Sequence, residues 1–208
     1  MLSDIGAAFP GDAIHAEESK RVAAADAHAV WYLDPLDGTT NFVHGLPEFS
    51  ISIARFVAGE PAVAVVHAPK LGELYSARRG AGAHRNETPI RVSKTPELAD
   101  SLVATGFPYR RAELPNNNLA NFGEMFLRVR DIRRLGSAAL DLAFVACGRF
   151  DAYWELHLER HDVAAGGLLV LEAGGGSPIW RGAEWPLGRS ILATNGPLHA
   201  PLLRLLKS

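Results

Sequence analysis

This sequence is short of the features that would place it in several broad classes of protein. Cys147 is the only cysteine among 208 residues, so an internal disulfide is excluded. No apolar run approaches the length of a membrane span, and Met1 to Asp4 lack the basic and apolar segments of a secretory leader. Neither sign of charge dominates, with 21 Lys and Arg against 23 Asp and Glu, so no broad basic surface is available for nucleic acid. The sequence therefore predicts a cytoplasmic protein that binds neither membrane nor nucleic acid.

The composition that is present is that of a folded domain. Hydrophobic residues make up 48% of the chain and charged residues 21%, which is the mix of a soluble globular protein. The length suffices for one sizeable core, and neither an internal repeat nor a linker divides the sequence. We therefore expect a single domain over residues 1–208.

Apolar periodicity changes half-way along the chain. Residues 49–54 alternate with a period of two, and further apolar runs follow across turns, which predicts a mainly antiparallel sheet. The second half alternates strands with helices, so the sequence predicts an α/β protein. The expected strands are residues 13–19, 49–54, 61–68, 73–77, 102–105, 131–134, 150–156 and 190–194. The expected helices are residues 119–129, 136–148, 162–174 and 197–206. Residues 20–28 are expected to form a loop.

The most informative stretch runs from Trp31 to Phe42, where an apolar segment meets two carboxylates three residues apart. We expect a strand that ends at Asp34, because Pro35 has no N–H to give to a strand ladder. Gly38 permits a positive φ or the close approach of a ligand to the backbone. The stretch therefore predicts a sharp turn between a strand and a short helix.

The chemistry of this turn favours a phosphate ester held through a metal ion. Asp34 and Asp37 repel each other unless a cation lies between them, and Mg²⁺ prefers such oxygen ligands. Thr39 is a suitable N-cap, so the free N–H groups at the start of the helix are available to a phosphate. An Asp-capped turn that binds nothing is the structural alternative.

Three segments resemble the inositol monophosphatase family of Mg²⁺-dependent phosphatases. Residues 34–42 match the family's first signature, Asp-Pro-Ile/Leu-Asp-Gly-Thr-Thr-Asn-Phe, without a gap. Residues 162–166, followed by the Glu-Ala-Gly-Gly of residues 172–175, resemble the second signature, although His161 stands where tryptophan is usual. Residues 135–143 are similar to the family's Gly-Ser/Thr-Ala corner, which faces the sugar ring of the substrate.

The resemblance implies a layered α/β sandwich of alternating helices and sheets, as in inositol monophosphatases and fructose 1,6-bisphosphatases, and a homodimer. It also implies two or three bound Mg²⁺ ions. The family's Gly-Glu-Glu strand is matched at Glu17, with Ala16 in place of the glycine. We attribute His161 to altered packing, because an imidazole nitrogen suits Mg²⁺ poorly. The expected metal ligands are Glu17, Asp34, the Leu36 carbonyl, Asp37 and Asp162.

The reaction that the resemblance implies is release of phosphate from inositol 1-phosphate by a metal-activated water. Glu17, Thr39 and Asp37 are the expected catalytic residues, with Thr39 and Glu17 orienting the water. Glu155 lies seven residues before Asp162, the spacing of a family glutamate that binds substrate hydroxyls. The expected substrate contacts are Gly38, Thr39, Gly136, Ser137, Ala138 and Glu155.

One departure from the family concerns the beginning of the chain. The family starts with a pair of helices and a loop whose aspartate partners the signature threonine, and residues 1–16 are too few to hold them. We therefore expect Thr39 to lack that partner. This departure implies a shortened sequence, a weakened site or lost activity.

Several alternatives stay open. Residues 37–39, Asp-Gly-Thr, also resemble the motif of haloacid-dehalogenase-type phosphatases, but that motif needs carboxylates two residues apart. Other members of the inositol monophosphatase family act on fructose 1,6-bisphosphate, histidinol phosphate or 3′-phosphoadenosine 5′-phosphate. Outside enzymes, the alternative is a catalytically silent, dimeric binding protein on the same fold.

Overall fold

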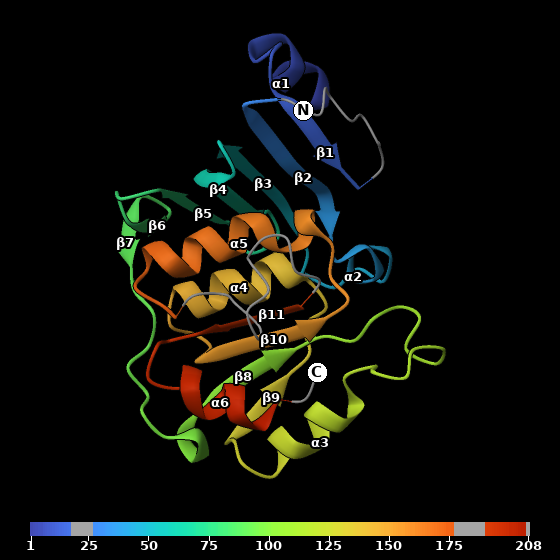
Figure 1. The fold of residues 1–208 in the computed structure, drawn as a ribbon, viewed down its shortest axis with the longest axis vertical. Helices are drawn as coiled ribbons and strands as arrows, with labels where there is room; N and C mark the ends of the chain where they lie inside the picture. The colour runs from blue at the N-terminus through green and yellow to red at the C-terminus, as the bar shows by residue number, and fades with distance from the viewer. Residues whose placement is uncertain (18–26, 177–189, 207–208) are drawn as a thin grey trace.

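The computed structural model describes residues 1–17, 27–176 and 190–206. Within them the strands form a seven-stranded and a four-stranded sheet (Figure 1). The large sheet, in the order β1-β2-β3-β4-β5-β6-β7, consists of Ala13–Ala16 (β1), Ala29–Asp37 (β2), Ser50–Val57 (β3), Glu60–Ala68 (β4), Glu73–Arg78 (β5), Ala83–Arg85 (β6) and Thr88–Ile90 (β7). The small sheet, in the order β11-β10-β8-β9, consists of Leu102–Thr105 (β8), Asp131–Arg133 (β9), Ala152–Leu156 (β10) and Ser190–Thr194 (β11).

The described helices are Leu2–Ala8 (α1), Thr39–Val43 (α2), Leu119–Phe126 (α3), Ala138–Ala146 (α4), Arg160–Glu172 (α5) and His199–Leu205 (α6), with a 3₁₀ turn at Leu98–Asp100. None of these described helices is long and apolar enough to cross a membrane.

Helices α4 and α5 lie between the two sheets, and α3 and α6 cover the other face of the small sheet (Figure 1). Strand β10 shows how the sequence produces these layers. Its side chains point alternately to the two faces, so Tyr153 packs with α4 and α5 whereas Trp154 packs with α3 and α6. The two middle helices approach closely, since a Cβ on Gly166 would lie 2.4 Å from the Leu142 Cβ. The α/β order predicted from the sequence is confirmed.

Helix α1 covers the outer face of the large sheet at β1 and β2. Leu2 and Ile5 of α1 pack against the cluster of Ile14, Ala16 and Leu33, in which Leu33 is fully buried. Asp12, after α1, accepts hydrogen bonds from Trp31 Nε1 and Arg55 Nε, both at 2.8 Å. The sequence did not predict α1, because seven residues are too few to show a helical period.

Most predicted elements are confirmed, and the errors fall at short elements and at ends. The large sheet is antiparallel apart from the parallel pair β1–β2. Strands β6 and β7 were missed, because three residues show no period. On α3, Met125 is fully buried whereas Phe126 is 60% exposed. The loop predicted at residues 20–28 lies, apart from its last two residues, outside the described residues.

Candidate active site

The two carboxylates of the central stretch lie on either side of a bulge in β2. The pairing of β2 with β3 shifts register between Asp34 and Asp37, and this irregularity accommodates Pro35, which has no N–H to donate. The prediction that the strand ends at Asp34 is therefore wrong, because β2 continues to Asp37. Asp34 is 2% exposed, and its Oδ1 accepts a hydrogen bond from the Leu36 N–H at 2.9 Å.

A sharp turn follows β2 and starts α2. Gly38 has a φ of +90°, and a Cβ there would lie 2.9 Å from the Glu48 backbone oxygen, so only glycine fits. Gly38 is also the N-cap, so the prediction that Thr39 caps this helix is wrong. Thr39 is the first helical residue, and its Oγ1 donates to the Leu36 carbonyl oxygen at 3.0 Å. The exposed Thr39 hydroxyl therefore lies over the segment that joins the two carboxylates.

Asp37 is bound to the start of α4, about 100 residues further along the chain. Its Oδ2 accepts hydrogen bonds from Ser137 Oγ at 2.6 Å and Ala139 N at 2.8 Å, and its Oδ1 accepts one from Ala138 N at 3.3 Å. The first N–H groups of a helix have no partner in their own helix, and a carboxylate also meets the positive end of the helix dipole. Ser137 occupies the predicted N-cap position, but its buried hydroxyl binds Asp37 and not its own helix.

Asn41 joins the first signature to the Gly-Ser-Ala corner, and sequence reasoning gave it no role. Its buried amide donates to the backbone oxygens of Glu48 at 2.6 Å and Leu135 at 2.7 Å. Gly136 follows with a φ of +89°, and a Cβ there would lie 2.6 Å from Arg134 Nη1. The position of Asn41 inside the matched signature was the signal that would have found it.

Asp162 lies in the first turn of α5. The prediction that it opens this helix is wrong, because the N-cap is Glu159 and Asp162 is the third helical residue of a capping box. Its Oδ2 accepts a hydrogen bond from the Glu159 N–H at 2.7 Å, and its Oδ1 lies 3.4 Å from His161 Nε2. The Ser52 hydroxyl of β3 donates to the His161 carbonyl at 3.3 Å, which ties the start of α5 to the large sheet.

Glu17 reaches the same place from the end of β1. Strands β1 and β2 are parallel with Ala16 opposite Leu33, so the next residue, Glu17, follows beside Asp34. One ligand atom from each of Glu17, Asp34 and His161 lies within 4.8 Å of the other two. The fold therefore collects potential metal ligands from β1, β2 and α5.

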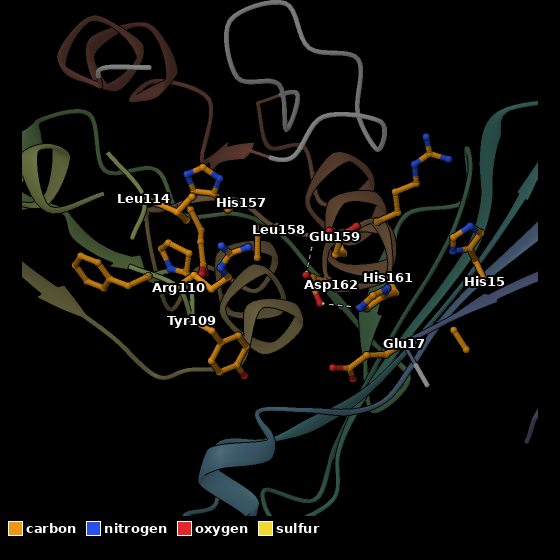
Figure 2. A pocket seen from close by; sticks show the side chains of 15 residues that line it. His15, Glu17, Tyr109, Arg110, Leu114, His157, Leu158, Glu159, His161 and Asp162 are labelled. Carbon is orange, nitrogen blue, oxygen red and sulfur yellow. Dashed lines mark hydrogen bonds and ion pairs between the residues drawn. The ribbon is translucent and has the colours of Figure 1, made fainter. Parts of the chain in front are cut away.

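Glu17, His161 and Asp162 face a pocket of about 990 Å³ (Figure 2), and Glu155 also lines it. The Tyr153 hydroxyl donates to Glu155 Oε2, and a Cβ on Gly106 would lie 1.9 Å from that oxygen. The Glu155 carboxylate therefore needs glycine at residue 106. The lining residues are His15, Ala16, Glu17, Phe107, Pro108, Tyr109, Arg110, Leu114, Glu155, His157, Leu158, Glu159, Arg160, His161 and Asp162.

Burial makes the charged forms of these carboxylates unfavourable. Burial, followed by the charge of Asp37, raises the pKa of Asp34 from 3.8 to about 7. Burial likewise raises the pKa of Asp37 and of Asp162 to about 7, and neighbouring carboxylates add to the effect. Burial also raises the pKa of Glu155 to about 7. A divalent cation relieves such repulsion, so this set of oxygen atoms fits a metal ion of the kind that the resemblance implies.

A sequence profile described as "Inositol monophosphatase family" matches residues 1–207. The chain belongs to the inositol monophosphatase family. The inositol-1-monophosphatase of Mesorhizobium japonicum is 39% identical over 208 residues, which cover 100% of this chain and 78% of that protein. The Nus factor SuhB of Pasteurella multocida is 43% identical over 207 residues, which cover 100% of this chain and 75% of that protein. The solved structure of an inositol monophosphatase from Anabaena (Nostoc) has a TM-score of 0.92 at 45% identity, covering 98% of this chain and 81% of that chain.

Membership of the inositol monophosphatase family confirms the resemblance and the layered α/β fold expected from it. The structure brings most of the predicted site residues together, while their roles stay predictions. Sequence reasoning missed Tyr153 and the need for glycine at residue 106, because neither stands out locally. It also treated His161 as a packing residue, whereas its imidazole lies among the carboxylates.

Proposed function

We propose that this member of the inositol monophosphatase family is a Mg²⁺-dependent hydrolase that releases phosphate from inositol 1-phosphate. The observation that carries the proposal is the meeting of Glu17, Asp34, Asp37 and Asp162 next to a pocket large enough for a sugar phosphate. The name of the relative from Mesorhizobium japonicum supports the choice of substrate.

The proposed cofactor is two or three Mg²⁺ ions, whose bound form supplies a water of lowered pKa and positive charge to neutralise the phosphate. The proposed ligands from the side chains are Glu17, Asp34, Asp37 and Asp162. The Leu36 carbonyl oxygen has two lone pairs and accepts from Thr39 Oγ1, so one lone pair is left for a metal ion.

Thr39 and Glu17 are proposed to act on the attacking water. The Thr39 hydroxyl hydrogen is committed to Leu36, so its oxygen is left to accept a hydrogen bond from the water. Glu17 is exposed at the pocket, where its carboxylate would orient the water and receive its proton. The N–H groups of Gly38 and Thr39 lie at the start of α2 and would hold phosphate oxygens.

The rest of the substrate is proposed to contact the wall formed by Glu155 and the corner of Gly136, Ser137 and Ala138. Tyr153 holds Oε2 of Glu155, which leaves Oε1 to accept a hydrogen bond from a ring hydroxyl. Because the Ser137 side chain is fully buried against Asp37, the contribution of this corner to the substrate would come from its backbone.

We also propose that the protein is a cytoplasmic homodimer whose partners are small phosphorylated molecules, and neither nucleic acid nor membrane. Light scattering at increasing protein concentration tests the dimer. A monomer at concentrations where the enzyme turns over would contradict it.

The test of the function is release of inorganic phosphate from inositol 1-phosphate with Mg²⁺ and with EDTA. We expect turnover that EDTA abolishes, and a loss of at least about 10²-fold in kcat for Asp37→Asn, because misplacement at a reacting centre has effects of that size. Glu124→Gln is the matched control, since this carboxylate of α3 lies at the surface, where it pairs with Arg128.

Three outcomes would change the assignment. A higher kcat/KM with histidinol phosphate, fructose 1,6-bisphosphate or 3′-phosphoadenosine 5′-phosphate would replace the substrate. A phosphorylated Asp34 trapped during turnover would contradict attack by water. Folded protein that binds Mg²⁺ without turnover would favour the silent binding protein, and would leave the relative named Nus factor SuhB as the closer functional comparison.

A further inference from the structure

His161 occupies a position that the family's second signature reserves for tryptophan, and its imidazole faces the acidic residues of the pocket. Figure 2 shows the His161 ring beside Asp162, on its own helix, and near Glu17, which follows β1. The backbone holds it there, because the His161 carbonyl accepts a hydrogen bond from the Ser52 hydroxyl of β3 at 3.3 Å.

The distances suit a shared metal ion. Ligand atoms of Glu17, Asp34 and His161 lie within 4.8 Å of one another. Three equally spaced ligand atoms about 2.1 Å from one ion are at most about 3.6 Å apart, so shifts of up to about 0.7 Å per ligand close the site. A purely structural histidine would instead satisfy its ring nitrogen by a hydrogen bond, and 3.4 Å from Nε2 to Asp162 Oδ1 is long for one.

Asp34 contributes a carboxylate oxygen to the same three-residue group. Its side chain is 2% exposed, and only Oδ1 accepts a hydrogen bond, from the Leu36 N–H, within the part of the chain that the structure describes. The Asp34 carboxylate therefore keeps Oδ2 available to a cation, and a carboxylate placed among others favours a positive charge beside it. Glu17 and His161 supply the further ligand atoms next to Asp34.

We propose that His161 is a nitrogen ligand of the metal centre, so that this protein binds a first-row transition-metal dication through Glu17, Asp34 and His161. Imidazole suits transition metals, whereas Mg²⁺ favours oxygen ligands alone, so the exchange of tryptophan for histidine shifts selectivity from Mg²⁺ towards ions such as Mn²⁺. The inference rests on the proposed function only in placing the metal centre, since it concerns binding and not turnover.

The experiment is pulsed electron paramagnetic resonance of the whole chain with substoichiometric Mn²⁺. We expect a ¹⁴N coupling of an imidazole bound to Mn²⁺, which disappears in His161→Phe. Titration should show a Mn²⁺ dissociation constant at least about tenfold higher in this variant, with Mg²⁺ binding changed far less, since even indirect partners of a metal ligand contribute 10–100-fold in affinity.

His15→Phe is the matched control, because it removes another imidazole from the same pocket but outside the three-residue group. It should keep both the ¹⁴N coupling and the Mn²⁺ affinity. His161→Trp, which carries the residue usual in the family, guards against a variant that fails to fold. Absence of the coupling in the unmodified protein, or its survival in a folded His161 variant, overturns the proposal.

The two proposals fail separately. Turnover of inositol 1-phosphate with Mg²⁺ but without ¹⁴N coupling would retain the phosphatase and reject His161 as a ligand. A His161-dependent coupling without turnover of any phosphate ester would retain the ligand and reject the phosphatase.

Discussion

Replacement of Asp34 by asparagine should stabilise the metal-free protein at pH 8. The Asp34 side chain is 2% exposed, and burial together with the charge of Asp37 raises its pKa from 3.8 to about 7. An asparagine can keep the hydrogen bond from the Leu36 N–H, because only Oδ1 accepts it, and it removes the charge. The substitution therefore isolates the electrostatic effect.

The sign follows from the direction of the pKa shift. Between pH 3.8 and about 7 the unfolded chain has lost the Asp34 proton while the folded protein keeps it. Protonation of Asp34 therefore favours the folded protein, and this contribution to stability is fully present below pH 3.8. It is lost as the pH rises towards about 7, where the Asp34 carboxyl of the folded protein also ionises. From pH 5 to pH 8 a single such group lowers the free energy of unfolding by roughly 2.5 kcal/mol.

Urea unfolding in EDTA at pH 5 and pH 8 measures the effect. From pH 5 to pH 8 we expect the free energy of unfolding to fall by roughly 2.5 kcal/mol more in the unmodified protein than in Asp34→Asn. The comparison of the two proteins cancels the effect of His199, which both contain. Burial lowers the pKa of His199, so its contribution to stability rises with pH, in the opposite direction to that of Asp34. Added Mg²⁺ should restore the stability of the unmodified protein at pH 8, and it should raise the stability of the variant much less. Equal losses in the two proteins would refute this account of the acidic cluster.

Three other substitutions test contacts of the site. Gly106→Ala should displace Glu155 and so raise KM for inositol 1-phosphate about tenfold. The KM for p-nitrophenyl phosphate, which has no ring hydroxyls, should change far less. Equal changes in KM for both substrates would show that Glu155 does not select the ring. Ser137→Ala should lower the free energy of unfolding by about 2 kcal/mol, because it removes a buried hydrogen bond to Asp37. A change below about 0.5 kcal/mol in urea unfolding would contradict that hydrogen bond. Gly38→Ala should lower the free energy of unfolding by at least about 2 kcal/mol in the same assay, because residue 38 has a positive φ and a Cβ there would meet the Glu48 backbone oxygen. An unchanged free energy of unfolding would mean that the turn differs in solution.

The sequence determined those parts of the site that depend on neighbouring residues. Residues 34–42 are contiguous, and their side chains and turn preferences specify two carboxylates, a glycine turn and a helix start. Period-two and helical patterns located the longer strands and helices for the same reason. The boundaries were missed where a local preference competed with a distant partner. Pro35, for example, was expected to end the strand, but the bulge against β3 carries the pairing through to Asp37.

Only the tertiary structure decided which side chains meet. Asp37 binds the start of α4 because both sheets pack on the same pair of helices, and no local pattern encodes a contact across 100 residues. The parallel register of β1 and β2 brings Glu17 beside Asp34, and the docking of α5 on β3 adds His161. Local sequence sets the backbone conformation and the type of each chemical group. The distances between groups from separate elements depend on strand register and helix packing, which are properties of the whole folded chain.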